Sequence, residues 1–139
     1  MFSLIGINVL FDPVFSDYIG PLNTSKLGQP RYRKCPVSVE DVSQLPPIHI
    51  VCISHDHYDH TDVPTIRALH ANFPSIRWCV PAKMDEWLRR TIDDPDVRAL
   101  SWWESETLEI KQKNVLVEFV PAQHWCIRGL TWSWYVKTF

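Results

Sequence analysis

The sequence predicts an α/β fold in which helices pack on a mixed β-sheet. A β-branched apolar run at residues 48–53 is typical of a buried strand. Two segments with helical periodicity, residues 62–73 and 82–92, are separated by a second apolar run at 76–80. Alternating apolar and polar residues from Leu108 onward favour antiparallel strands at the end of this series.

The chain begins with an apolar segment, residues 1–11, which we expect to form the first strand. It lacks the basic start and the small-residue cleavage site of a signal peptide, and it is shorter than the ~20 residues of a membrane span. Residues 12–47 follow as a long Pro-rich loop without clear periodicity, which predicts a functional or mobile connection. Its basic cluster, residues 31–34, is either a solvated surface or a contact for an anion or phosphate.

The first predicted helix has Asp62 at its N-cap and Pro64 in its first turn. Its apolar face comprises Val63, Ile66, Leu69 and Phe73. His70 lies beside that face, and we expect it to be an ordinary helix residue rather than a metal ligand. In the second helix, Met84, Trp87 and Leu88 are predicted to face the core.

Three further segments are assigned after the second helix. Residues 99–103 are predicted to form a strand, and Leu108 and Ile110 are predicted to lie on the inner face of another. Lys113-Asn114 is the candidate turn. Residues 115–120 should then return as a more buried strand.

Composition limits the class of protein. At 139 residues the chain is at most one domain, and its 45% apolar and 22% charged residues are ordinary for a globular protein. A net charge of −2 argues against nucleic-acid binding. The cysteines are dispersed without a C-x-x-C pair, and Cys52 and Cys79 lie in strand-like runs, which predicts buried thiols in a reduced, intracellular protein.

The run Ser54-His55-Asp56-His57-Tyr58-Asp59-His60 is the strongest functional signal. It follows a predicted buried strand, and imidazole and carboxylate are common zinc ligands. Side chains two apart in extended backbone point the same way, so His55 and His57 can reach one metal ion. Asp59 and His60 follow the expected strand end and can face a second metal ion nearby. The alternative is a solvated loop that is histidine-rich by accident.

A second element supplies a third ligand. The predicted strand 115–120 ends at Val120-Pro121, and His124 follows shortly after it. Histidines His55, His57 and His124 with one open coordination position would form a catalytic rather than a structural zinc site. A ligand role for Cys126, two residues further on, stays open.

At this point the sequence resembles the metallo-β-lactamase-fold hydrolases, whose H-x-H-x-D-H signature matches residues 55–60. Other segments are similar to one branch, the N-acylphosphatidylethanolamine-hydrolysing phospholipase D group. These segments are Asp12-Pro13-Val14-Phe15-Ser16, residues 43–48, Trp102-Trp103-Glu104 and residues 121–126. The resemblance extends from about residue 7 to about residue 127.

The resemblance implies an αβ/βα sandwich with two zinc ions. His55, His57 and His124 are the implied ligands of one ion, and Asp59 and His60 those of the other. The implied reaction is hydrolysis of a phosphodiester in N-acylphosphatidylethanolamine, which releases N-acylethanolamine and phosphatidic acid. Asp59 is also the candidate catalytic residue, as a group that orients the attacking water. No residue is assigned to substrate binding.

The same resemblance predicts that residues 1–139 are a partial domain, about the first half of the sandwich, with the second half absent. The family has a bridging aspartate and a final metal histidine after the His124 position, and the last fifteen residues here contain no Asp, Glu or His. We therefore expect one zinc ion or none in this chain, uncovered apolar faces, and dimerisation as one way to cover them.

Three functions remain open from the sequence. The first is a zinc phosphodiesterase of the phospholipase D type, which would be inactive if the missing half is essential. The second is another hydrolase of the same fold, such as a lactonase or a soluble phosphodiesterase. The third is a non-catalytic fragment. A membrane phospholipid substrate implies a cytoplasmic protein with peripheral membrane association.

Overall fold

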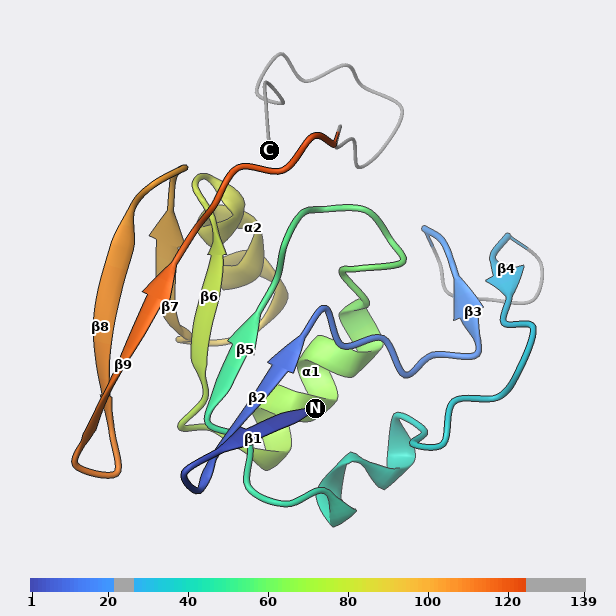
Figure 1. The fold of residues 1–139 in the computed structure, drawn as a ribbon. Helices are drawn as coiled ribbons and strands as arrows, with labels where there is room; N and C mark the ends of the chain where they lie inside the picture. The colour runs from blue at the N-terminus through green and yellow to red at the C-terminus, as the bar shows by residue number, and fades with distance from the viewer. Residues whose placement is uncertain (22–26, 125–139) are drawn as a thin grey trace.

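The computed structural model describes residues 1–21 and 27–124 (Figure 1). A five-stranded sheet of order β1-β2-β5-β6-β7 forms its centre. The strand β1 runs antiparallel to β2, whereas β2, β5, β6 and β7 are parallel to one another. The strands are β1 (Phe2–Leu4), β2 (Ile7–Phe11), β5 (Ile50–Cys52), β6 (Arg77–Pro81) and β7 (Asp96–Leu100).

Two helices cover one face of this sheet. The helix α1 (Val63–Asn72) connects β5 to β6, and α2 (Met84–Thr91) connects β6 to β7. Each helix directs its apolar stripe at the sheet, so that Leu69 of α1 and Leu88 of α2 are fully buried with Trp78 of β6. The mixed sheet with flanking helices that the sequence predicts is therefore confirmed as a partial αβ/βα architecture.

A hairpin packs against the opposite face of the sheet. Its strands are β8 (Ser105–Ile110) and β9 (Lys113–Glu118), and they pair with each other rather than with the central sheet. Leu108 and Ile110 of β8 bury their side chains against Ile50 of β5 and Cys79 of β6. Arg98 of β7 adds a polar link across this interface, because its Nε donates to the carboxylate of Glu106 at 2.5 Å.

The long connection between β2 and β5 contains three short elements. These are β3 (Tyr18–Ile19), β4 (Gln29–Pro30) and the 3-10 helix η1 (Glu40–Gln44). Arg31, from the basic cluster, is used structurally: its guanidinium donates to the backbone carbonyls of Val14 and Ser16. Its neighbour Tyr32 is almost fully exposed, which agrees with a solvated surface for that position.

Several predicted boundaries are wrong. The apolar start is a hairpin rather than one strand, because Ile5 and Gly6 both adopt positive φ and reverse the chain between β1 and β2. The strand predicted at 99–103 ends at Leu100, and Trp103 adopts a left-handed φ of 66° in the following turn. The β8–β9 turn is at Lys111-Gln112, with φ values of 50° and 59°, and not at Lys113-Asn114.

The return strand is also less buried than its apolar composition indicates. Val115 and Val117 are half-buried toward the central sheet, whereas Leu116 points outward and is 65% exposed. The alternation of side chains along a strand places every second residue on the outer face, where the described residues provide no covering element for Leu116.

Candidate metal centre

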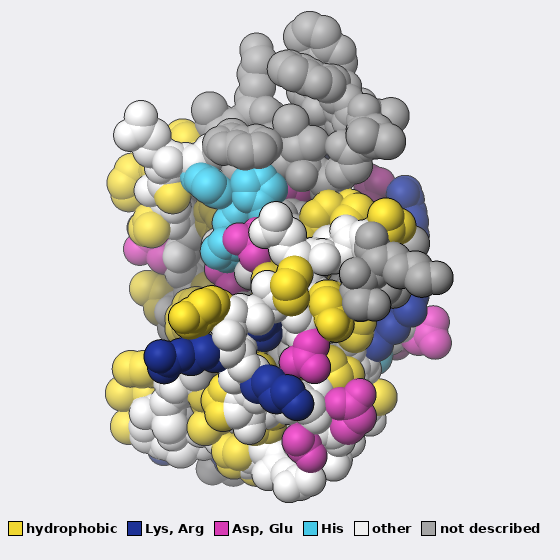
Figure 2. All heavy atoms as spheres, turned by 90° about the vertical axis from the view of Figure 1, so that its right-hand side faces the viewer, with side chains coloured by type: hydrophobic (Ala, Val, Ile, Leu, Met, Phe, Trp, Pro, Cys, Tyr) yellow, Lys and Arg dark blue, Asp and Glu magenta, His cyan; other side chains and the backbone are white. Residues whose placement is uncertain are grey.

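The predicted ligands gather where strands end. Asp12 directly follows β2, and residues 54–60 follow β5. Because β2 and β5 are parallel, both segments emerge from the same edge of the sheet. His124 reaches this edge six residues after the end of β9. Figure 2 shows a group of histidine side chains (cyan) on the surface of the molecule.

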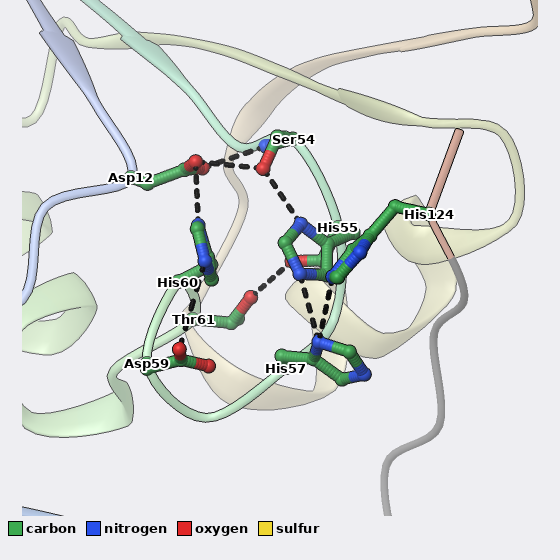
Figure 3. A network of polar contacts seen from close by, with 8 residues as sticks. All are labelled: Asp12, Ser54, His55, His57, Asp59, His60, Thr61 and His124. Carbon is green, nitrogen blue, oxygen red and sulfur yellow. Dashed lines mark hydrogen bonds and ion pairs between the residues drawn. The ribbon is translucent and has the colours of Figure 1, made fainter. Parts of the chain in front are cut away.

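Three histidines converge on one point (Figure 3). His55 Nε2 lies 2.9 Å from His57 Nδ1, and His124 Nε2 lies 3.2 Å from the same Nδ1 atom. Within residues 1–21 and 27–124, these are the one set of three or more His, Cys, Asp or Glu residues whose ligand atoms lie within 4.8 Å of one another. The three ligands predicted for the first zinc ion are thus brought together.

A metal ion fits this arrangement better than hydrogen bonds do. Each ring nitrogen of a neutral imidazole is either one donor or one acceptor. His57 Nδ1 faces two other ring nitrogens, and its single in-plane lone pair cannot accept two hydrogen bonds in good geometry. A cation among the three nitrogens would take a lone pair from each, and three histidine ligands leave one position of a zinc ion open.

The surroundings of His55 keep its imidazole in the neutral form that binds a metal ion. Burial and the nearby rings of His60, His57 and His124 lower the pKa of His55 to about 4, against a smaller opposing effect of Asp12. The imidazole is therefore neutral at neutral pH, which is the form that binds a metal. Ser54 fixes the ring orientation, since its hydroxyl lies 2.8 Å from His55 Nδ1, the nitrogen on the far side of the ring.

Asp59 and His60 form a second pair beside this cluster. His60 Nε2 and Asp59 Oδ2 are 3.7 Å apart, a separation suited to two ligands of one metal ion. Asp59 is 60% exposed, so its carboxylate reaches solvent. The two residues match the predicted positions for a second ion, and their roles as ligands, and that of Asp59 in catalysis, stay predictions.

Asp12 is a site residue to which the sequence reasoning assigned no role. Its carboxylate accepts hydrogen bonds from the Ser54 backbone N–H at 2.7 Å and the Ser54 hydroxyl at 2.6 Å. One of its oxygens also lies 2.8 Å from His60 Nδ1. A carboxylate on the far nitrogen of a metal-binding histidine orients the ring and raises its basicity. The available sequence signal was its place directly after the predicted first strand, residues 1–11.

Hydrogen bonds to backbone carbonyls stabilise the turn between β5 and α1. The backbone N–H groups of His60 and Thr61 donate to the carbonyl of His57, and the Thr61 hydroxyl donates to the carbonyl of His55 at 2.6 Å. Asp62 occupies the predicted N-cap position, but its side chain makes no capping bond. Its buried carboxylate accepts instead from the Ser16 hydroxyl, which ties the turn to the long connection.

A pocket of about 540 Å³ opens beside the histidines, between the central sheet and the β8–β9 hairpin. His55, His60 and His124 line it together with Phe11, Val117 and Val120. The site therefore combines a polar, metal-binding wall with an apolar wall, an arrangement that suits a ligand with both kinds of surface.

The other candidate residues lie apart from the cluster. His70 is on α1, as a helix residue, and it does not belong to the converging group. Cys126 falls outside the described residues, as does the terminal segment 125–139. No helix in the described parts of the chain has the length and apolar character needed to cross a lipid bilayer.

Comparison with known proteins identifies relatives whose sequences are similar to this chain. The chain is 34% identical over 133 residues to N-acyl-phosphatidylethanolamine-hydrolyzing phospholipase D 1 of Caenorhabditis elegans, covering 93% of this chain and 36% of that protein. It is 33% identical over 127 residues to the mitochondrial N-acyl-phosphatidylethanolamine-hydrolyzing phospholipase D of Saccharomyces cerevisiae, covering 90% and 25%. An uncharacterised protein of Mycobacterium bovis is 32% identical over 132 residues, covering 94% and 33%.

The chain spans between 25% and 36% of the length of these relatives. A family model described as the beta-lactamase superfamily domain matches residues 7–138, which include the four parallel strands of the central sheet, both helices, the hairpin and every candidate ligand. Since this match extends over nearly the whole chain, the protein belongs to the beta-lactamase superfamily.

Proposed function

We propose that this chain carries a metal-binding part of a zinc-dependent phosphodiesterase that acts on N-acylated phosphatidylethanolamine. The products are N-acylethanolamine and phosphatidic acid. The observation that carries the proposal is the convergence of His55 Nε2, His57 Nδ1 and His124 Nε2 beside the Asp59–His60 pair.

The chain's own residues have distinct parts in this reaction. The three histidines hold the first ion, and Asp59 and His60 supply ligands to a second. When bound, such ions supply a nucleophilic water at neutral pH and neutralise charge on the phosphoryl oxygens. Asp12 and Ser54 hold His60 and His55 in orientation, and Asp59, whose carboxylate reaches solvent, orients the attacking water.

A lipid substrate is supported by the pocket and by the relatives. Apolar side chains of Phe11, Val117 and Val120 adjoin the histidines, and an acylated substrate has apolar surface next to its phosphodiester. Two relatives are named as hydrolases of N-acyl-phosphatidylethanolamine. We propose accordingly a cytoplasmic protein that associates peripherally with membranes, and vesicle co-sedimentation tests this association.

The test has a binding arm and a turnover arm. The purified chain is loaded with zinc, freed of excess metal and assayed for zinc per chain. It is then incubated with vesicles that contain N-acylphosphatidylethanolamine, and N-acylethanolamine release is measured. His57→Ala should remove most of the bound zinc, whereas His70→Ala, a histidine away from the cluster, should bind as the wild type does. Equal zinc content in both variants would contradict the assignment of the centre.

A metal-binding chain without turnover is the second candidate. It is favoured by the Asp59–His60 pair, which acquires no third converging His, Cys, Asp or Glu among the described residues. Zinc bound with no product from lipid vesicles would support this candidate for the chain alone. Hydrolysis of soluble esters or lactones but not of lipid would instead support another hydrolase of the same fold.

A further inference from the structure

Two cysteines lie side by side beneath the metal centre, and no step of the proposed reaction uses them. Cys52 is the last residue of β5, and Cys79 is the central residue of β6. They are direct partners in the register of these parallel strands. Both side chains face the hairpin side of the sheet, and both line the pocket that His55 and His60 line.

The backbone geometry suits a disulfide between them. Neighbouring strands lie about 4.8 Å apart, and disulfides join Cα atoms separated by about 4.4 to 6.8 Å. Each thiol is the largest cause of the other's pKa shift, which places the two side chains in contact. The register of the sheet thus holds the two cysteines as direct neighbours.

The two thiols are also chemically unequal. The neighbouring Cys52 thiol lowers the pKa of Cys79, against opposing effects of burial and of Glu106 and with a smaller lowering effect of Arg98. The pKa of Cys52 is raised, first by the Cys79 thiol and then by burial. One thiol of the pair is therefore the better nucleophile, and the other is placed to attack its oxidised product.

We propose that Cys52 and Cys79 form a redox modification site that a peroxide converts to a disulfide. The Cys79 thiolate attacks one peroxide oxygen, which breaks the O–O bond and, with one proton, yields a sulfenic acid and water. The Cys52 sulfur then displaces the sulfenic oxygen, which leaves as a second water. Two thiols lose two electrons and two protons, and hydrogen peroxide takes up both.

The bond would close a loop that carries the metal ligands. Residues 52–79 contain the whole 55–60 run and α1, so the disulfide would join the two ends of the segment that holds His55, His57 and His60. Cross-linking reduces the conformational freedom of the unfolded loop, so the thermal midpoint of the chain should rise on oxidation and fall again on reduction.

The experiment uses the full 139-residue chain in two forms. In a Cys35→Ser/Cys126→Ser variant, the only thiols are those of Cys52 and Cys79. Hydrogen peroxide should remove both titratable thiols from this variant, measured after unfolding, and dithiothreitol should restore both. The unaltered chain provides a second measurement: peptide mapping after peroxide and alkylation should recover a peptide pair linked through Cys52 and Cys79.

The matched control changes one partner. With Cys79→Ser added to the double variant, Cys52 has no partner, so no intramolecular disulfide and no oxidation-dependent rise in thermal midpoint should appear. The proposal is overturned if both thiols remain titratable under peroxide that oxidises free glutathione. It is overturned equally if the mapped disulfides join two chains rather than residues 52 and 79 of one.

Discussion

Asp12 orients His60 from outside the group of candidate ligands. It bonds to both Ser54 and His60, so it links the end of β2 to two positions of the histidine run. We expect Asp12→Asn to weaken zinc binding by about 10- to 100-fold, because an amide cannot accept as strongly from the ring N–H of His60. Competition with a chromophoric chelator measures the affinity.

The control for this change is Asp17→Asn. Asp17 lies in the same connection, and its exposed side chain has no hydrogen-bond or ion-pair partner among the described residues, so zinc affinity should stay as in the wild type. An Asp12→Asn protein with unchanged affinity would show that His60 keeps its orientation without the carboxylate, and would remove Asp12 from the site.

His49 gives the folded chain a dependence on pH. Its Nδ1 accepts a 2.9 Å hydrogen bond from the Asn8 backbone N–H, and this bond joins β2 to the start of β5. Burial, and then the charge of Lys111, lower its pKa from 6.5. The unfolded chain therefore binds this proton more readily, so the stabilisation is complete above pH 6.5 and is lost as the pH falls through the folded pKa.

We expect His49→Gln to reduce this loss, since glutamine keeps an acceptor and does not titrate. Urea unfolding of both proteins at pH about 7.5 and about 5.5, on either side of the ordinary histidine pKa, measures it. The difference in unfolding free energy between the two pH values should be smaller for the variant. An equal difference would show that other groups cause the pH dependence.

At the scale of elements, the β8–β9 hairpin connects the core to His124. Leu108 is 3% exposed and packs against the central sheet, whereas Leu116 on the partner strand is 65% exposed. Leu108→Ala should lower the free energy of unfolding by about 2 to 5 kcal/mol, because it leaves a cavity beneath the hairpin. Leu116→Ala, the same change on the outer face, should alter it by about 0.5 kcal/mol or less.

The same pair of variants tests whether the hairpin positions the third ligand. If the hairpin holds His124 at the centre, Leu108→Ala should also reduce zinc affinity under conditions where the protein remains folded. Isothermal titration of each variant with zinc gives the comparison. Equal affinities would indicate that His124 is placed by contacts of its own and not by the hairpin.

At the scale of the whole molecule, a metal ion would join segments that are far apart in the chain. His55 and His57 follow β5, and His124 follows β9, 67 positions after His57. An ion that binds only the folded state stabilises it by about 2.7 kcal/mol at 100 times its dissociation constant. Zinc should therefore raise the thermal midpoint by several degrees, and EDTA should reverse the change.

His57→Ala is the control for this effect, because it removes the nitrogen shared by both short contacts of the cluster. Its thermal midpoint should not respond to zinc in the range that stabilises the wild type. A response as large as that of the wild type would indicate a binding site elsewhere on the chain. Differential scanning fluorimetry with and without the chelator suffices for both proteins.

Local patterns in the sequence determined much of this protein. The sequence predicts the ligand run from His55 to His60, its place after a buried strand, and the helical stripes that include Leu69 and Leu88. These features are predictable because ligand type and side-chain periodicity depend on residues close in sequence. Turn positions were harder to predict, because Lys111 and Gln112 adopt positive φ without the Asn-Gly pair that usually marks such a turn.

Tertiary structure alone decided the remaining contacts. The Asp12–His60 contact joins residues 48 positions apart, and the Cys52–Cys79 pairing depends on the register of two parallel strands. Neither follows from local pattern, because the register of distant strands is set by how their faces pack on the helices and the hairpin. The sequence predicts His55, His57 and His124 as ligands of one ion, and the same packing supplies the geometry that brings their ring nitrogens together.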